Sequence, residues 1–227
     1  MNQNQYLPEI PADDDIETIL SEAVWAAHSL FQRGKTSGSS ANLSVIHNGV
    51  IYISASGTCF GTLTTKDFAA VAPDGTVLPG KKPSKELPLH RMLYQSDAAV
   101  RAVIHTHSTY SVLWSCTGYA AAHPFNCIPP ITPYLDMKLG PVGLVPYEKP
   151  GSEELFAAFG NILDKSSGFL LKQHGPVVPG RDVMDAFFRL EELEESARIA
   201  WELRLSLIHI SLAWRITWDS SSGRVVI

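Results

Sequence analysis

The chain has 227 residues, of which 45% are hydrophobic and 18% are charged, with a formal net charge of −5 and a pI of about 5.9. This length and composition suffice for one substantial core, and the lack of a basic block argues against a nucleic-acid partner. No apolar run is long enough to span a bilayer, the N-terminus lacks a signal-peptide core, and the three cysteines show no paired spacing. We therefore expect a cytoplasmic protein with reduced thiols and no membrane partner.

The first half of the chain predicts one helix, two hairpins and a second helix, in that order. Residues 1–12 are typical of a loose arm, and apolar residues at helical spacing predict a helix over 16–31. Asn48-Gly49 lies between two apolar runs and predicts a type I′ hairpin. A second hairpin is predicted at residues 73–75, a Pro-Asp-Gly turn, and Ser84 is expected to cap the helix that follows.

The second half alternates short apolar runs with helical patterns. AVRAVIHTH (99–107), VGLVPY (142–147) and GFLLKQHG (168–175) predict strands. Residues 151–163 predict a helix, and a longer helix is expected to start at Asp182.

These elements indicate one α/β domain over residues 13–204, because hairpins are present and no regular βαβ alternation, repeat or linker is seen. We expect a central, mainly antiparallel or mixed sheet flanked by helices. Residues 205–227 form an atypical tail, whose LSLIHIS stretch is typical of a strand. LSLIHIS is also what one reading frame of a sequencing-library adapter encodes. A chimeric origin and a genuine C-terminal strand both stay open, and resequencing the locus distinguishes them.

Two histidines, His105 and His107, close the predicted strand at residues 99–107. Side chains two positions apart on a strand share a face, so both imidazoles are expected to point the same way. The pair alone is weak support for a metal, because a catalytic zinc-like site has three protein ligands and one open position. His174, at the end of another apolar run, is the candidate third ligand, and Glu86 could add a carboxylate. The alternatives are a capped or core histidine and a glutamate that complements a helix dipole.

Three clusters of small polar residues could bind a phosphate through hydroxyl groups, backbone amides and one lysine. Each cluster taken singly is more typical of a loop or a helix cap. No Walker or dinucleotide-binding glycine pattern is present, so a small phosphorylated substrate fits better than a nucleotide. The candidate phosphate-binding residues are Ser39, Ser40, Asn42, Ser56, Gly57, Ser84 and Lys85.

The motifs SSANLS, SASG, KPSKExxxH, HTH and QHG, taken in this order, resemble the class II aldolase/adducin family along roughly residues 14–204. The resemblance implies a class II aldolase-like fold and a Zn²⁺ or another divalent ion. It implies that this ion is bound by His105, His107 and His174. It also implies that Glu86 is the acid/base and, in some members, a further metal ligand.

The same resemblance extends to substrate binding and assembly. It implies a homotetramer, in which Tyr134 matches a tyrosine that reaches a neighbouring subunit's site. A buried aromatic residue with a satisfied hydroxyl is the alternative for Tyr134. The chain departs from the usual aldolase pattern at Ala41, where the family has glycine, and at Lys85, where it has a second serine.

The stretches KPSKE, ITPYLDMKLGPVGLVPYEKPG and LKQHGPVV look most like the branch of the family that decarboxylates a 3-oxo-tetronate 4-phosphate. That branch implies a metal-dependent carbon–carbon lyase of sugar-acid catabolism. It releases CO2 and forms dihydroxyacetone phosphate through a metal-stabilised enediolate. An aldolase or epimerase acting on a sugar phosphate such as L-fuculose 1-phosphate is the first alternative. A non-catalytic, adducin-like interaction module is the alternative from another class.

Overall fold

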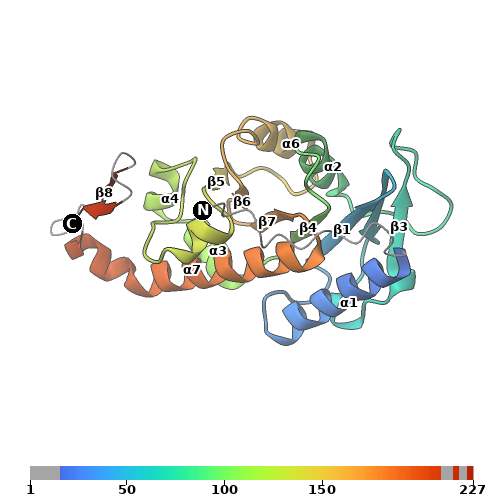
Figure 1. The fold of residues 1–227 in the computed structure, drawn as a ribbon, viewed down its shortest axis with the longest axis horizontal. Coiled ribbons are helices and arrows are strands. Elements are labelled where there is room, and N and C mark those ends of the chain that lie inside the picture. Colours follow the sequence, from blue (N-terminus) through green and yellow to red (C-terminus); the bar gives the residue numbers. More distant parts are fainter. Residues whose placement is uncertain (1–15, 211–216, 220–223, 227) are drawn as a thin grey trace, which may run out of the picture. The chain divides into compact units, whose positions relative to one another are not determined.

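The computed structural model describes residues 16–210, 217–219 and 224–226 (Figure 1). The arm predicted at residues 1–12 lies outside these described residues. The chain divides into two units, of which the first comprises residues 1–104 and 180–187 and the second residues 105–179 and 188–227. Among the described residues, no helix combines the length and the apolar character that crossing a bilayer requires.

The first unit contains the predicted type I′ hairpin. β1 (Asn42–His47) pairs antiparallel with β2 (Val50–Ser54), and His47 lies opposite Val50. Asn48 and Gly49 have φ angles of 48° and 80°. Positive φ at both central residues defines this turn, so the prediction from the Asn-Gly pair is confirmed.

β3 (Phe68–Val71) pairs antiparallel with β2 and is followed by the second predicted turn. Val71 and Val77 form an antiparallel bridge around residues 73–75. The strand order in this unit is β3-β2-β1-β4, where β4 covers Ala102–His105.

The helix predicted at residues 16–31 is confirmed as α1 (Ile16–Gln32), which packs on β1. It also contacts the two short 3₁₀ helices η1 (Phe60–Thr62) and η2 (Thr65–Asp67). Three of its buried residues are alanines, which let the helix backbone approach the sheet closely. The buried residues are Leu20, Ala23, Ala26, Ala27 and Leu30.

The start of α2 (Leu87–Ser96) differs from the prediction. The N-cap residue is Glu86 rather than Ser84, and the Glu86 backbone amide donates to Ser84 Oγ at 3.3 Å. The helix starts later than expected because Pro88 fits best in the first turn, where its missing N–H costs no helical hydrogen bond.

The second unit contributes three strands in the order β7-β6-β5. β5 (Val142–Val145) is parallel to β6 (Gly168–Leu171), and β6 is antiparallel to β7 (Gly175–Gly180). The sheet is therefore mixed, and the α/β fold class is confirmed. The sequence did not predict β7, because Pro176 and Pro179 argue against a strand interior.

Short helices flank these strands. α3 (Thr109–Ser115) packs on β6, and α6 (Glu153–Gly160) packs on β5. α6 is shorter than the predicted helix at 151–163. α3, α4 (Gly118–Ala122) and α5 (Tyr134–Lys138) were not predicted, because five to seven residues are too few for a periodic apolar pattern.

The last long helix, α7 (Val183–Ile210), starts where predicted. The Asp182 carboxylate accepts a backbone amide of the first turn at 2.6 Å. The helix continues through residues 205–210, so the strand interpretation of this stretch is wrong there. β8 (Thr217–Asp219) and β9 (Arg224–Val226) pair antiparallel in the tail. The origin of the tail stays a prediction.

Candidate metal centre and active site

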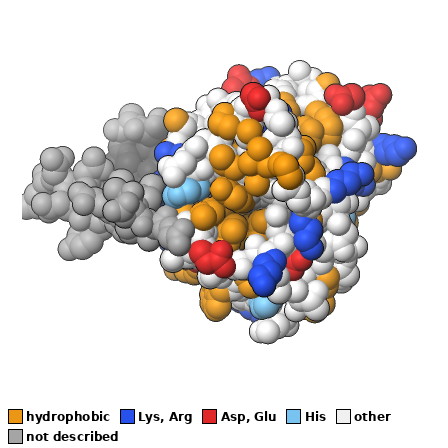
Figure 2. All heavy atoms as spheres, turned by 90° about the vertical axis from the view of Figure 1, so that its right-hand side faces the viewer, with side chains coloured by type: hydrophobic (Ala, Val, Ile, Leu, Met, Phe, Trp, Pro, Cys, Tyr) orange, Lys and Arg blue, Asp and Glu red, His pale blue; other side chains and the backbone are white. Residues whose placement is uncertain are grey.

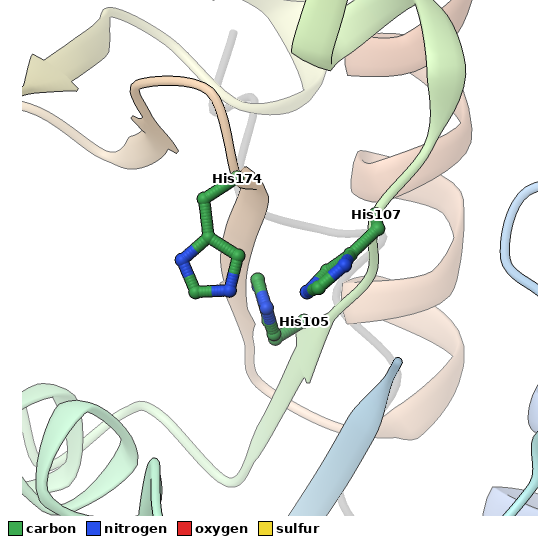
Figure 3. Close-up of side chains that lie close together, drawn as sticks. All are labelled: His105, His107 and His174. Atoms are coloured by element: carbon green, nitrogen blue, oxygen red, sulfur yellow. The ribbon is translucent and has the colours of Figure 1, made fainter. Parts of the chain in front are cut away.

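Three imidazoles from two separate segments meet in the second unit (Figure 3). His105 is the last residue of β4, His107 follows it in a loop, and His174 lies in the turn before β7. The ring centroids of each pair are 4.6–5.0 Å apart. One ring nitrogen from each histidine lies within 4.8 Å of the others. The structure therefore brings together the three histidines that the sequence singled out as metal ligands.

The strand argument for the HxH pair holds only in part. β4 ends at His105, so the alternation of side chains along a strand does not extend to His107. The Thr106 amide still donates to the Pro176 carbonyl at 3.3 Å, which holds the loop beside β7. The two rings converge because of this backbone contact rather than because of the strand period.

Gly175 makes the approach of the two segments possible. Its φ is +151°, and a Cβ placed there would lie 2.0 Å from the Thr106 carbonyl oxygen. The preceding turn has Gln173 at φ 60°, and its amide donates to Ser115 Oγ at 2.9 Å. His174 lies between Gln173 and Gly175, and this main-chain geometry directs its imidazole toward the other two histidines.

The tautomer of His105 follows from its partner. Its Nδ1 lies 2.8 Å from the Pro176 carbonyl oxygen, which can only accept a hydrogen bond. Nδ1 therefore carries the hydrogen, and Nε2 presents its lone pair. A backbone carbonyl commonly fixes a metal-binding histidine in this way. His105 is fully buried, His174 is 6% exposed and His107 is partly exposed, so two of the three imidazoles are shielded from solvent. The three-nitrogen set fits a divalent ion with one open position.

A buried carboxylate from α7 fixes the segment that follows His107. Glu194, 2% exposed, accepts the backbone amides of Tyr110 and Ser111 at 3.0 and 2.9 Å. It also accepts the Ser111 hydroxyl at 2.6 Å. These contacts cap the first turn of α3, which starts two residues after His107. Sequence reasoning missed Glu194, because a glutamate within a long helix gives no local signal of such a contact.

Glu86 lies in the first unit and is 4% exposed. Its Oε2 accepts from Asn42 Nδ2 at 2.8 Å, and Asn42 Oδ1 lies 2.6 Å from His90 Nε2. His90 Nδ1 is 2.7 Å from Ser44 Oγ, which is 2.7 Å from the Tyr94 hydroxyl. A continuous chain of hydrogen bonds therefore ends on the carboxylate that the sequence marked as the acid/base.

Two of the predicted phosphate-binding clusters lie side by side. Ala55 and Pro83 form an antiparallel bridge, and the Ser56 amide donates to the Lys82 carbonyl at 2.9 Å. Gly57, at the turn of its cluster, has a φ of +81°. This pairing places the SASG and PSK segments on one local surface of the first unit.

The remaining candidates differ in exposure. Ser39 and Lys85 are exposed, and the Ser40 hydroxyl donates to a nearby carbonyl at 2.6 Å. Asn42 is 6% exposed, and both ends of its amide bind protein groups. An amide NH2 has two hydrogens, so the phosphate contact expected of Asn42 would need the second one. Tyr134 is 59% exposed, so the alternative of a buried aromatic residue is wrong.

Residues 21–201 match the family model described as Class II Aldolase and Adducin N-terminal domain. The chain belongs to this family. It is 38% identical to 3-oxo-tetronate 4-phosphate decarboxylase of Escherichia coli over 82% of this chain and 88% of that protein. It is 32% identical to L-fuculose phosphate aldolase of Methanococcus maripaludis over 79% of this chain and 94% of that protein. The crystal structure of YgbL from Klebsiella pneumoniae matches with a TM-score of 0.79 and 37% identity, covering 84% of this chain and 92% of YgbL.

These matches confirm the resemblance that the ordered motifs carry, and with it the fold. The family depends in general on divalent metals, and the described residues contain the three-histidine cluster that such an ion needs.

Proposed function

We propose that this protein is a metal-dependent decarboxylase that converts a 3-oxo-tetronate 4-phosphate into dihydroxyacetone phosphate and CO2, in sugar-acid catabolism in the cytoplasm. The observation that carries the proposal is the three-histidine cluster, in a chain that shares 38% identity over most of its length with a decarboxylase of this name.

In this proposal His105, His107 and His174 bind Zn²⁺ or another divalent ion. When bound, the ion acts as a Lewis acid toward the substrate's ketone oxygen and stabilises the enediolate. The chain's own part is to hold three neutral imidazoles in place. Pro176 does so for His105, because its carbonyl keeps the hydrogen on Nδ1 and directs Nε2 inward.

Glu86 handles the proton. When the bond between the carboxylate carbon and C2 breaks, CO2 leaves. The electron pair of the broken bond stays on the substrate and forms the enediolate across C2 and C3. C2 must then gain one proton to give dihydroxyacetone phosphate. A buried carboxylic acid is suited to deliver it, since little water competes. Glu86 is also proposed as a further metal ligand.

Phosphate binding is assigned to the paired SASG and PSK segments and to the SGSSAN loop. Lys85 is exposed and can contribute its charge to the phosphate or to the departing carboxylate. The residues proposed to bind the phosphate are Ser39, Ser40, Asn42, Ser56, Gly57, Ser84 and Lys85. Tyr134 is proposed to reach the active site of a neighbouring subunit, for which its exposed position is suitable.

A homotetramer is proposed as the working assembly. Figure 2 shows hydrophobic side chains gathered on the face in view, with charged side chains around them. The first unit itself exposes Trp25, Val77 and Leu78 by 53%, 46% and 37%. Exposed apolar surface of this kind is typical of contacts between subunits.

The second candidate function is aldol cleavage of a sugar phosphate, favoured by the 32% identity to L-fuculose phosphate aldolase. Purified protein is incubated with 3-oxo-tetronate 4-phosphate and, separately, with L-fuculose 1-phosphate. We expect CO2 release from the first and no cleavage of the second. The reverse result would establish the aldolase. A protein that purifies without metal, and that added metal does not activate, would instead be an adducin-like interaction module.

A further inference from the structure

Five side chains of the first unit form one unbroken hydrogen-bond chain, in the order Tyr94, Ser44, His90, Asn42 and Glu86. Its four links measure between 2.6 and 2.8 Å. Ser44 and His90 are fully buried, and Asn42 and Glu86 are 6% and 4% exposed. In such surroundings each donor must face an acceptor, because a mismatched polar pair would carry a large desolvation cost. The direction of every link can therefore be worked out.

The Glu86 end sets the direction of the first two links. An ionised carboxylate only accepts hydrogen bonds, so Asn42 must turn its Nδ2 toward Oε2. Its Oδ1 then faces His90 Nε2, and a carbonyl oxygen also only accepts. His90 must therefore donate from Nε2.

The other two links follow from the histidine. A neutral imidazole with its hydrogen on Nε2 has Nδ1 as an acceptor, so the Ser44 hydroxyl donates to Nδ1. The Ser44 oxygen in turn accepts from the Tyr94 hydroxyl. Burial raises the pKa of Tyr94, which keeps the phenol protonated and able to donate at neutral pH. All four links thus donate toward Glu86.

We propose that His90 is a positioning residue for Glu86. Its Nε2–H tautomer holds Asn42, and Asn42 in turn holds Oε2 of Glu86, so that the carboxylate is kept in one orientation. The proposal rests on the acid/base role proposed for Glu86.

The hydrogen-bond chain resists any reversal of the Asn42 amide. Reversal would place Asn42 Oδ1 against the carboxylate oxygen and would require His90 to change tautomer, with both hydroxyl groups turning as well. The orientation of the carboxylate is therefore retained.

The first test compares two substitutions at one position. His90→Leu removes both ring nitrogens, whereas His90→Gln can place an amide N–H near the position of Nε2. We expect His90→Leu to lower kcat by about ten- to a hundredfold, with KM and metal content within about twofold of wild type. We expect His90→Gln to recover most of the lost kcat. His47→Gln, a partly exposed histidine at the end of β1, is the matched control and should keep wild-type kinetics.

A folded His90→Leu variant with wild-type kcat would overturn the proposal. So would a His90→Gln variant that is no better than His90→Leu while both retain the wild-type melting temperature.

The second test needs no substitution in the protein that is measured. Nitrogen-15 NMR of the imidazoles reports which ring nitrogen carries the hydrogen, and the His90→Gln spectrum identifies the His90 signals. We expect the neutral Nε2–H tautomer. An Nδ1–H tautomer or a cationic ring would overturn the proposal. Wild-type protein that shows the Nε2–H tautomer but releases no CO2 would contradict the proposed function while supporting the hydrogen-bond chain.

Discussion

The histidine cluster of the second unit and Glu86 of the first unit are positioned by different means. The cluster depends mainly on the backbone: a glycine that lets two segments approach, and the Pro176 carbonyl that orients His105. Glu86 is instead held by a chain of four side chains. Few substitutions can disturb a site that the backbone positions, but each of those should have a large effect on it. A site held by a chain of side chains, here called the side-chain relay, should be weakened by a substitution at any member of that chain. This difference fits the two proposed tasks, since a metal needs a fixed frame and an acid/base needs a carboxylate held in one orientation.

The largest effect is expected from removing a metal ligand. His105→Ala removes the imidazole that the Pro176 carbonyl orients, and leaves two histidines of the cluster, too few for tight binding of a divalent ion. We expect metal content and CO2 release to fall by more than about a hundredfold, beyond the loss of an outer-shell partner. Metal analysis after dialysis and a CO2 assay measure both. The exposed His123→Ala is the control, and equal metal content in the two variants would contradict the cluster's role.

Glu86→Gln tests most directly whether the proton-transfer role of Glu86 is separate from metal binding by the histidine cluster. The amide keeps the size of the carboxylate and still accepts from Asn42, but it cannot exchange a proton. We expect kcat to fall by about 10²–10⁴-fold while the histidine cluster retains its metal. Steady-state kinetics and metal analysis on the same sample test this. Glu153→Gln, the same change at an exposed site in α6, should leave both unchanged. Wild-type turnover in Glu86→Gln would remove the acid/base assignment.

The histidine cluster was predictable in part from a local signal, and the set of three ligands came from the resemblance to the family. His105 and His174 each follow an apolar run, and a polar ligand at a strand end needs no knowledge of the tertiary contacts. The type I′ turn at Asn48-Gly49 was predictable for the same reason, since two residues specify it. β7 was not, because the two prolines within Gly175–Gly180 locally oppose a strand and only the tertiary context overrides them.

The sequence indicates which residues of the side-chain relay share a face, but not that the two faces meet. Glu86, His90 and Tyr94 are spaced four residues apart, which places them along one face of a helix. Asn42 and Ser44 are two apart, on one face of β1. Each spacing indicates a polar face, but neither tells which helix packs against which strand. That pairing is a tertiary fact, so the relay could not be derived from the chain alone.

Gly175→Ala tests the backbone scaffold itself. The new Cβ would lie 2.0 Å from the Thr106 carbonyl oxygen at a φ of +151°, so the segments must separate. We expect a loss of about 3 kcal/mol in unfolding free energy and weaker metal binding. Urea unfolding and metal titration measure these two quantities. Gly118→Ala is the matched control, because its Cβ meets nothing within 4 Å. A Gly175→Ala protein with the stability and affinity of the control would contradict the account of the scaffold.

The smallest effect is expected at a buried side chain that holds the segment after His107. Glu194 accepts two amides and a hydroxyl at the start of α3, so Glu194→Gln weakens three contacts near His107. We expect unfolding free energy to fall by about 1–3 kcal/mol and metal affinity to fall a few-fold. The neighbouring Glu195→Gln weakens an exposed ion pair with Arg198, and should change unfolding free energy by less than about 1 kcal/mol. If the two variants bind metal equally well, the main chain alone positions His107. The histidine cluster would then differ from Glu86 even more strongly, because no side chain would help to position it. If Glu194→Gln loses affinity as expected, even a backbone-built metal site depends on one buried carboxylate to hold the loop that leaves it.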